Sequence, residues 1–212
     1  MLKLYSYFRS SAAYRVRIAL NLKGLSYEII PVHLTREGGE QRRPEYRSIN
    51  PQMRVPALVL PDGEVLTQSL AIIDYLEDTH PEPPLLPRDP VRRAKTRAVA
   101  QAVACDIHPI NNLIVLQHLK RSLKHDQATI DSWYVHWIVS GFEAIEAMIA
   151  SGPYAFGAEV TLADVCLVPQ FANARRYQVP LDKFPRIVAV DAACQKLPAF
   201  EQARPDNQPD AE

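Results

Sequence analysis

The chain has no excess charge, few cysteines and no long apolar run, and each absence excludes a class of protein. Lys and Arg together number 24, and Asp and Glu together also number 24, so the formal net charge is zero. A surface for nucleic acid or for an anionic membrane carries a basic excess, so this balance argues against both partners. The expected partner is a small molecule or another protein.

The three cysteines, Cys105, Cys166 and Cys194, lie far apart in the 212-residue chain. No Cys-x-x-Cys pair is present, which excludes a dithiol redox pair and a zinc ribbon. Apart from His108, the other five histidines show no ligand spacing, so no metal site is expected. All three cysteines have apolar neighbours and are expected to be small core residues of a reduced, cytoplasmic protein.

The sequence shows no targeting or membrane-spanning signal. Its first residues form a strand-like pattern and lack the apolar core of a signal peptide. No apolar run approaches the ~18 residues that span a bilayer, so no membrane span is expected. With 47% hydrophobic residues, a chain of this length can form one or two domains with a sizeable core.

The first 79 residues alternate strand and helix signals. Two apolar runs indicate strands around a helix that begins near Ser11, which implies a parallel strand pair with a right-handed crossover. Two shorter strands follow, joined by the Pro61-Asp62-Gly63 turn, and another helix is expected from Ser69. The four expected strands are Leu2–Tyr5, Ser26–Val32, Val55–Leu60 and Glu64–Leu66.

The start of the first helix carries a cation and two hydroxyls, Arg9, Ser10 and Ser11. A helix N-terminus has unpaired N–H groups and a partial positive charge, so it favours an anion. Spacing alone leaves two interpretations open: a serine that caps the helix, contributing ~1 kcal/mol, or a site for an anion or thiolate. Further along this helix, Arg15 and Arg17 are expected to lie off its apolar face, and Gly24 is the expected stop.

The segment His80–Pro90 holds five of the 18 prolines and is expected to link two domains. Beyond it almost every segment has a helical pattern, and the tail after Glu201 is expected to be a loose surface segment. The sequence thus predicts a mixed α/β domain over residues 1–80, a linker over 81–90 and an all-helical domain over 91–212. The expected helices are Val91–Leu123, Gln127–Ala150, Leu162–Ala174 and Arg186–Leu197.

Several motifs in this domain order resemble those of a known family. Val55-Pro56 precedes an expected strand, Gln68-Ser69 opens a helix, and Thr161–Asp164 forms a Ser/Thr-x-x-Asp/Glu capping box with an expected structural role. The SS-x-x-x-RVRIAL motif from Ser10, the IHPINN stretch and the ARR stretch are more specific. Together they resemble the zeta class of cytosolic glutathione transferases, which includes maleylacetoacetate isomerases and bacterial maleylpyruvate isomerases. The resemblance covers nearly the whole chain.

The resemblance implies a thioredoxin-like N-terminal domain, an all-helical C-terminal domain and glutathione as the cofactor. A cis Val55-Pro56 peptide would turn the Val55 backbone toward the cysteinyl amide of glutathione. The Gln68-Ser69 pair would bind the γ-glutamyl carboxylate at a helix N-terminus, with a plain N-cap as the alternative. The other implied cofactor contacts are Ser10, Ser11, Gln41, His108 and Asn112.

The implied activity is glutathione-dependent cis–trans isomerisation of maleylacetoacetate to fumarylacetoacetate. Reversible addition of the glutathione thiolate would make the double bond single for long enough to rotate. Ser10 or Ser11 would donate a hydrogen bond to the thiolate, and the resemblance favours Ser10. Tyr5 and Tyr7 are alternative hydroxyls, since other transferase classes use tyrosine.

Two arginines, Arg9 and Arg176, are implied to hold the carboxylates of a small acidic unsaturated substrate, with a plain surface charge as the alternative for Arg176. Many zeta members carry Cys-Ser-Trp where this chain has Ala12–Tyr14, so no auxiliary protein thiol is expected at the site. Some maleylpyruvate isomerases have arginines at the positions of Leu113 and Ile114, and their absence favours maleylacetoacetate.

Other functions stay open. These are maleylpyruvate isomerisation, conjugation or dehalogenation of small acidic electrophiles, and a glutathione-transferase-like binding module without catalysis. Such modules often lose the hydroxyl or the Gln-Ser pair, and this chain keeps both. Proteins of this architecture are usually symmetric dimers, so a homodimer is expected.

Overall fold

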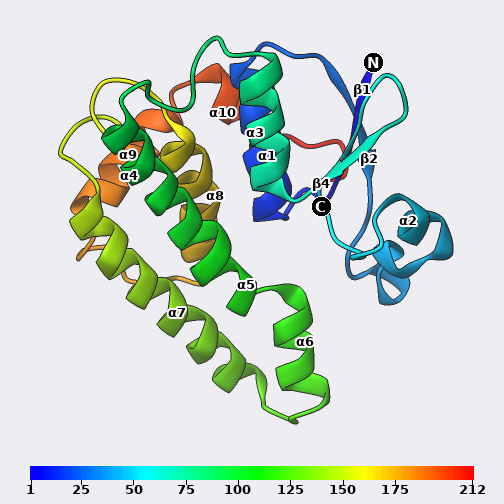
Figure 1. Cartoon of the computed structure of the whole chain (residues 1–212). Helices are drawn as coiled ribbons and strands as arrows, with labels where there is room; N and C mark the ends of the chain where they lie inside the picture. The colour runs from blue at the N-terminus through cyan, green and yellow to red at the C-terminus, as the bar shows by residue number, and fades with distance from the viewer. The chain divides into compact units, whose positions relative to one another are not determined.

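The computed structural model describes all 212 residues, which divide into two compact units (Figure 1). The first unit comprises Met1–Pro84 and Lys196–Glu212, and the second comprises Leu85–Gln195. The expected helical domain over 91–212 is therefore too long at its C-terminal end. Lys196–Glu212 belongs to the first unit because its helix packs on the first helix of the chain.

The first unit is built on a four-stranded sheet in the order β2-β1-β3-β4. The central strand β1 pairs parallel with β2 and antiparallel with β3, and β3 pairs antiparallel with β4. The strands are β1 (Leu2–Ser6), β2 (Tyr27–Pro31), β3 (Ala57–Val59) and β4 (Val65–Thr67). The helices are α1 (Ser11–Leu22), α2 (Pro44–Ile49), α3 (Ser69–Thr79) and α10 (Pro198–Ala203), with 3-10 turns η1 (Arg36–Gly38), η2 (Glu40–Arg42) and η4 (Pro205–Asn207). The parallel pair and its helical crossover are confirmed.

Helix α1 begins and ends where the chain satisfies its terminal backbone groups. At the start, Ser10 Oγ accepts the N–H of Ala13 at 3.2 Å. At the end, Gly24 has a φ of 67°, and the N–H groups of Gly24 and Leu25 donate to two carbonyls of the last turn. These two bonds form a Schellman motif, so the expected stop at Gly24 is confirmed.

Arg15 and Arg17 are buried, contrary to the expectation from periodicity, with 1% and 0% of their surface exposed. Helix α1 packs against both α3 and α10, so these residues have no solvent-facing side to occupy. Arg15 Nη1 donates to Ser69 Oγ at 3.2 Å, and Arg17 Nε donates to the Ala203 carbonyl at 3.0 Å. The expectation failed because the cover over α1 comes from a segment far away in the sequence.

The tail after Glu201 is ordered and bonded, so the expectation of a loose segment is wrong. Gln208 is buried, and its amide donates to two carbonyls of the preceding turns at 2.9 and 2.7 Å. The carboxylate of Asp210 accepts the N–H of Phe8 at 3.0 Å. The C-terminal segment, red in Figure 1, is therefore fastened to the residues that follow β1.

The second unit is entirely helical. Its helices are α4 (Pro90–Gln101), the π-helical segment η3 (Ala102–Ile107), α5 (His108–Ile110), α6 (Leu113–Arg121), α7 (Gln127–Met148), α8 (Leu162–Arg176) and α9 (Pro185–Cys194). Helix α8 is almost completely buried and packs against α4 and α9. The expected helix Val91–Leu123 is interrupted at Asn111 and Asn112, and α6 begins after Asn112, whose side chain caps it.

The start of α8 has the predicted capping box. Asp164 accepts the N–H and the hydroxyl of Thr161 at 2.8 and 2.9 Å, and also the N–H of Ala155 at 2.7 Å. Burial raises the pKa of the Asp164 carboxyl above its ordinary value, against the effect of these hydrogen bonds. Asp164 thus joins a helix start to the preceding loop, and the capping box is confirmed.

The cysteines differ in exposure, contrary to expectation. Cys166 and Cys194 are buried, and burial raises the pKa of the Cys194 thiol. Cys105 lies in η3 and is exposed. Its apolar neighbours in the sequence therefore did not indicate which side of the π-helical turn it occupies.

The helical run Pro90–Arg121 is long and apolar enough to cross a membrane, judged by its length and composition alone. The expectation that the chain has no membrane span stays a prediction. One such run is a weak indication, because core helices of soluble proteins pass the same test.

Candidate active site

Strand register places the predicted residues of the first unit at one edge of the sheet. Ser6, the last residue of β1, pairs with Pro31 at the end of β2. Ala57, the first residue of β3, pairs with Tyr5 on one side and with Thr67 at the end of β4 on the other. The segments after β1, β2 and β4 and the segment before β3 therefore leave the sheet at the same edge. They carry Arg9, Ser10, Ser11, Gln41, Val55, Pro56, Gln68 and Ser69.

Ser10 is the N-cap of α1, with φ −71° and ψ 112°. Because its Oγ accepts the N–H of Ala13, its own hydroxyl hydrogen stays free to donate to another group. Ser11 is the first residue of α1 and is buried, whereas Ser10 is partly exposed. The two interpretations of this turn therefore meet in one residue, since Ser10 can cap the helix and donate to an anion at once.

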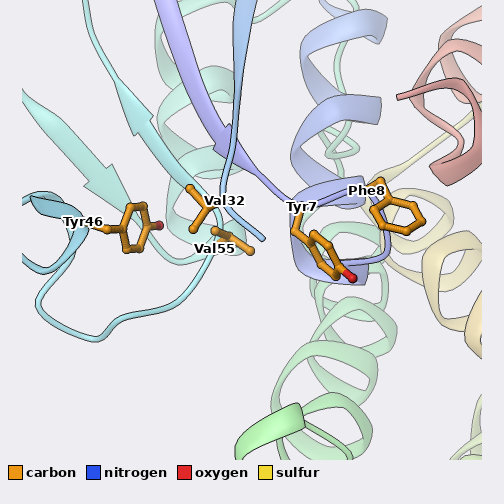
Figure 2. Packing of buried hydrophobic residues seen from close by; sticks show 5 residues of the cluster. All are labelled: Tyr7, Phe8, Val32, Tyr46 and Val55. Atoms are coloured by element: carbon orange, nitrogen blue, oxygen red, sulfur yellow. The ribbon is translucent and has the colours of Figure 1, made fainter. Parts of the chain in front are cut away.

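Arg9 lies exposed at the same turn and is oriented by two aromatic neighbours. Its Nη2 donates to the Tyr7 hydroxyl at 3.0 Å, and its guanidinium lies 4.9 Å from the centre of the Phe8 ring. Tyr7 and Phe8 are buried in a small cluster that also holds residues from the segment after β2, from α2 and from the segment before β3, shown in Figure 2. The Arg9 guanidinium is thus held in place by two buried aromatic residues. The cluster comprises Tyr7, Phe8, Val32, Tyr46 and Val55.

The peptide bond between Val55 and Pro56 is cis, as the resemblance predicted. The residue before it is fixed, because the Arg54 carbonyl accepts the Tyr46 hydroxyl at 2.6 Å and the Asn50 amide at 2.7 Å. The N–H and C=O of Val55 form no hydrogen bond with the rest of the chain. A polar peptide group at a sheet edge, buried with its side chain and left unpaired, is ready to pair with the backbone of a ligand.

Gln68 and Ser69 begin α3 in an unusual way. Gln68 has a φ of 70°, in the left-handed region that disfavours non-glycine residues, and no side chain caps this helix. The plain N-cap interpretation of Gln68-Ser69 is therefore wrong, and the first N–H groups of α3 are left available. Ser69 Oγ accepts from Arg15, which leaves the Ser69 hydroxyl hydrogen to donate elsewhere.

Gln41 is held against the loop that follows β2. Its Nε2 donates to the Leu34 carbonyl at 3.2 Å, while its Oε1 is buried with no hydrogen-bond partner in the protein. Gly39 makes this packing possible: its φ is 103°, and a Cβ there would lie 2.5 Å from Gln41 Oε1 and 2.7 Å from the Leu34 carbonyl. The unpaired amide oxygen of Gln41 is an acceptor that a ligand N–H can satisfy.

The remaining predicted residues, His108, Asn112 and Arg176, belong to the second unit. Asn112 Nδ2 lies 3.4 Å from His108 Nε2, and its Oδ1 accepts the N–H of Ile114 as the N-cap of α6. Asn112 therefore has a structural task that sequence reasoning missed, although Asn before an apolar helix is a common capping signal. Roles of His108 and Asn112 in cofactor binding stay predictions.

Arg176 ends α8 and differs from its neighbour Arg175. Arg175 Nη2 pairs with the buried carboxylate of Asp191 at 2.9 Å. Arg176 is exposed and its guanidinium lies 5.1 Å from the centre of the Tyr177 ring. Burial raises the pKa of Tyr134 to about 12, and the nearby cation of Arg176 opposes that rise. Of the two adjacent arginines, Arg176 is thus the one not committed to a carboxylate of the protein.

A parallel strand–helix–strand unit is followed in the first unit by an antiparallel strand pair and a helix, with a cis-proline before the third strand. This thioredoxin-like domain, with an all-helical unit after it, defines the class of glutathione transferases. The family models agree: the N-terminal domain of glutathione S-transferase matches residues 4–84, and the C-terminal domain matches residues 127–193.

Similar proteins narrow the class. The chain is 52% identical to the maleylacetoacetate isomerase of Pseudomonas aeruginosa, over 99% of this chain and 98% of that protein. The holo structure of a maleylpyruvate isomerase, a bacterial zeta-class transferase, is 48% identical with a TM-score of 0.95, over 99% of this chain and 100% of that one. The Anaeromyxobacter dehalogenans maleylacetoacetate isomerase with glutathione in its active site is 41% identical, with a TM-score of 0.89, over 100% of this chain and 98% of that one. The chain belongs to the zeta class of the glutathione S-transferase family.

Proposed function

We propose that this protein is a glutathione-dependent cis–trans isomerase that converts maleylacetoacetate to fumarylacetoacetate. The observation that carries the proposal is the capping geometry of Ser10, whose hydroxyl keeps a hydrogen to donate while it lies at the N-terminus of α1. Relatives named for this reaction are similar over nearly the whole chain. The substrate is accordingly a small acid with an activated double bond.

The sheet edge fits glutathione, a peptide-like molecule with a carboxylate at one end. The unpaired Val55 peptide group would pair with its cysteinyl amide. The uncapped start of α3, with the Ser69 hydroxyl, would bind its γ-glutamyl carboxylate. The buried, unpaired Oε1 of Gln41 would accept an N–H of the ligand. Each of these groups lacks a protein partner for the bond that glutathione would supply.

The main chemical task of the protein is to ionise a thiol. A thiol with a pKa of ~8.5 is only a few per cent thiolate at neutral pH. Lowering that pKa by two units requires ~2.7 kcal/mol of selective stabilisation. A hydrogen bond from the Ser10 hydroxyl to the thiolate, added to the partial positive charge at the start of α1, is of the right size. Ser10 acts here as a donor and not as a nucleophile.

When bound, glutathione supplies a thiolate that adds reversibly to the activated double bond, so that the bond can rotate before elimination. The exposed guanidinium of Arg9 would hold a substrate carboxylate and the negative charge that develops next to it. Arg176 is proposed as the second cation for the substrate, because Arg175 is already paired with Asp191. Both arginines bind and orient, and neither moves a proton.

No cysteine of this chain is suited to replace the cofactor. Ala12 and Ala13 stand at the start of α1 where many zeta members have Cys and Ser. Cys166 and Cys194 are buried, and none of the three cysteines belongs to the turn that carries Ser10. The reacting sulfur is therefore that of glutathione.

Maleylpyruvate isomerisation is the second candidate, since a structure of that enzyme is 48% identical to this chain. Leu113 and Ile114 begin α6 and carry no charge, whereas some maleylpyruvate isomerases have arginines at these positions, and this difference favours maleylacetoacetate. We further propose that the protein is a cytoplasmic homodimer, which size-exclusion chromatography with light scattering would test.

The test of the proposed function compares both substrates with and without glutathione. We expect purified protein to form fumarylacetoacetate only when glutathione is present, with a higher kcat/KM than for maleylpyruvate. The absence of any isomerisation in the presence of glutathione would contradict the proposal. Binding without turnover would identify a binding module, and halide release from haloacids would identify a dehalogenase.

A further inference from the structure

A buried cation lies behind the turn that presents Ser10. Arg17 is fully buried in α1, and its guanidinium donates to the carbonyls of Tyr7 and Phe8 at 3.4 and 3.1 Å. It also donates to Ser6 Oγ and to the Ala203 carbonyl, each at 3.0 Å. Burial lowers the pKa of Arg17 to about 10, so the group is charged at neutral pH. Burying a guanidinium costs free energy unless hydrogen bonds compensate, and the Arg17 guanidinium forms most of its hydrogen bonds with backbone carbonyls.

The turn Tyr7–Ser10 is fixed from both sides. The Ser10 N–H donates to the Tyr7 carbonyl at 2.9 Å, which closes the turn, and Arg17 directs the carbonyls of Tyr7 and Phe8 inward. The N–H of Phe8 points the other way, because a peptide N–H lies opposite the preceding carbonyl. That N–H donates to the carboxylate of Asp210 at 3.0 Å.

The Asp210 carboxylate forms one hydrogen bond within the protein. Its Oδ2 accepts the Phe8 N–H, and its Oδ1 is buried with no hydrogen-bond partner. The titratable groups that face Arg17 are the phenols of Tyr27 and Tyr14 and the carboxyl group of Asp210. The segment is anchored further on, where Glu212 pairs with Arg36 and lies 3.4 Å from His33 Nε2. The hydrogen bond of the Asp210 carboxylate thus goes to the backbone of the turn Tyr7–Ser10, and it holds this turn in place.

We propose that Arg17 and Asp210 are positioning residues for Ser10. Arg17 fixes the carbonyl side of the turn and Asp210 fixes the N–H side, so that the Ser10 hydroxyl is aimed at the sulfur of bound glutathione. The C-terminal segment, 202 residues away from Phe8 in the sequence, thereby takes part in ionising the thiol. This inference rests on the proposed role of Ser10 as the thiolate donor.

The direction in which the thiolate fraction of bound glutathione changes distinguishes a positioning role of Asp210 from an effect of its charge alone. Asp210 is negative, so its removal would by charge alone favour a nearby thiolate. Loss of positioning acts in the opposite direction, because a misaimed hydroxyl stabilises the thiolate less. Asp210→Ala and Asp210→Asn remove the same charge, but the asparagine keeps an oxygen that can accept the Phe8 N–H.

The experiment titrates the thiolate absorbance of bound glutathione against pH. We expect Asp210→Ala to lower the thiolate fraction at pH 7 by about fivefold to tenfold, because the charge-assisted bond to the Phe8 N–H is lost. Asp210→Asn should lower the fraction by a smaller factor, because its amide oxygen can still accept that N–H. Asp206→Ala is the matched control, because this carboxylate of the same segment is 82% exposed and has only a long contact, 3.9 Å, with Arg204. It should leave the fraction unchanged.

An unchanged or increased thiolate fraction in Asp210→Ala would overturn the proposal. Hydrogen exchange of the peptide that contains Phe8 gives a second measurement: exchange should quicken in Asp210→Ala. Quicker exchange with an unaltered thiolate pKa would show a structural role only, and would also overturn the proposal. Should that variant not fold, a chain ended after Pro209 is titrated in its place, with the same two outcomes.

Failure of this inference differs from failure of the proposed function. The thiolate titration needs only bound glutathione, and does not require turnover of any substrate. If the wild-type protein ionises glutathione but isomerises neither substrate, the proposed reaction is wrong. The comparison of the Asp210 variants then still tests the positioning role. If all variants isomerise and ionise equally well, the reaction stands and the positioning role fails.

Discussion

Helices α1 and α3 both begin at the same edge of the sheet, yet their first turns are built differently. The start of α1 is capped by a hydroxyl that accepts one N–H and keeps a hydrogen to donate. The start of α3 has no side-chain cap and follows a residue with a φ of 70°. The first arrangement offers one directed donor beside a dipole, which suits a thiolate. The second offers several N–H groups, which suits a carboxylate.

The comparison predicts that the two helix starts control different steps. Replacing Ser10 should remove the donor to the thiolate, so Ser10→Ala should lower kcat about a hundredfold and raise the thiol pKa of bound glutathione. Loss of the cap should cost only about 1 kcal/mol of unfolding free energy. The pH–rate profile and a denaturant titration measure both quantities. Ser11→Ala is the matched control, and an equal loss of kcat there would assign the donor to Ser11.

At the start of α3 the expected loss is in binding. Ser69→Ala should raise the Kd for glutathione about tenfold, because a hydrogen bond to a carboxylate is removed. The thiol pKa of bound glutathione should not change, since α3 does not hold the sulfur. Calorimetry gives the Kd and absorbance gives the pKa. A shifted thiol pKa with an unchanged Kd would reverse the assignment of the two helices.

Adjacent glycines test the loop that carries Gln41. Gly39→Ala should raise the Kd for glutathione severalfold and cost about 1–3 kcal/mol of stability, because the new Cβ meets Gln41 and the Leu34 carbonyl at a φ of 103°. Gly38→Ala is the control: its φ is 85°, but nothing lies within 4 Å of the new atom. It should show the strain without the loss of affinity. Equal losses of affinity would exclude displacement of Gln41 as the cause.

The smallest expected effect concerns the backbone before α3. Gln68→Gly should stabilise the protein by up to about 1 kcal/mol, because glycine adopts a φ of 70° without strain. The same change removes the bond from Gln68 Nε2 to Gln52 Oε1 and should weaken glutathione binding slightly. Thermal unfolding with and without glutathione separates the two effects. A destabilised variant would show that this side-chain bond outweighs the strain.

Local signals in the sequence were sufficient for much of this arrangement. Gly24 ends α1 as expected because a Schellman motif needs only a few consecutive residues. The cis bond at Val55-Pro56 followed from a family motif; without that motif the expected isomer would have been trans, because cis X-Pro bonds are uncommon in folded chains. The capping box at Thr161 is likewise local. In each case the determining atoms lie within one or two turns of chain.

Burial of a residue by a segment far away in the sequence could not be predicted from such local signals. Arg17 looked like a surface residue because α10 covers it from far away in the sequence, and the Ala203 carbonyl that it binds lies 186 residues later. Asp210 looked like part of a loose tail for the same reason, and η3 placed Cys105 on an exposed side that no pattern marked. Periodicity describes one face of a helix at a time. It does not report what the rest of the chain puts on the other face.

The first unit consists of the two ends of the chain, and this has a consequence for synthesis. When the sheet and α1 leave the ribosome, the carbonyl of Ala203 and the carboxylate of Asp210 do not yet exist. The nascent domain must keep the guanidinium of Arg17 hydrated until the whole second unit has been made. The turn that carries Ser10 can therefore reach its final geometry only after the second unit has been made, so the ability to ionise bound glutathione should appear late in synthesis.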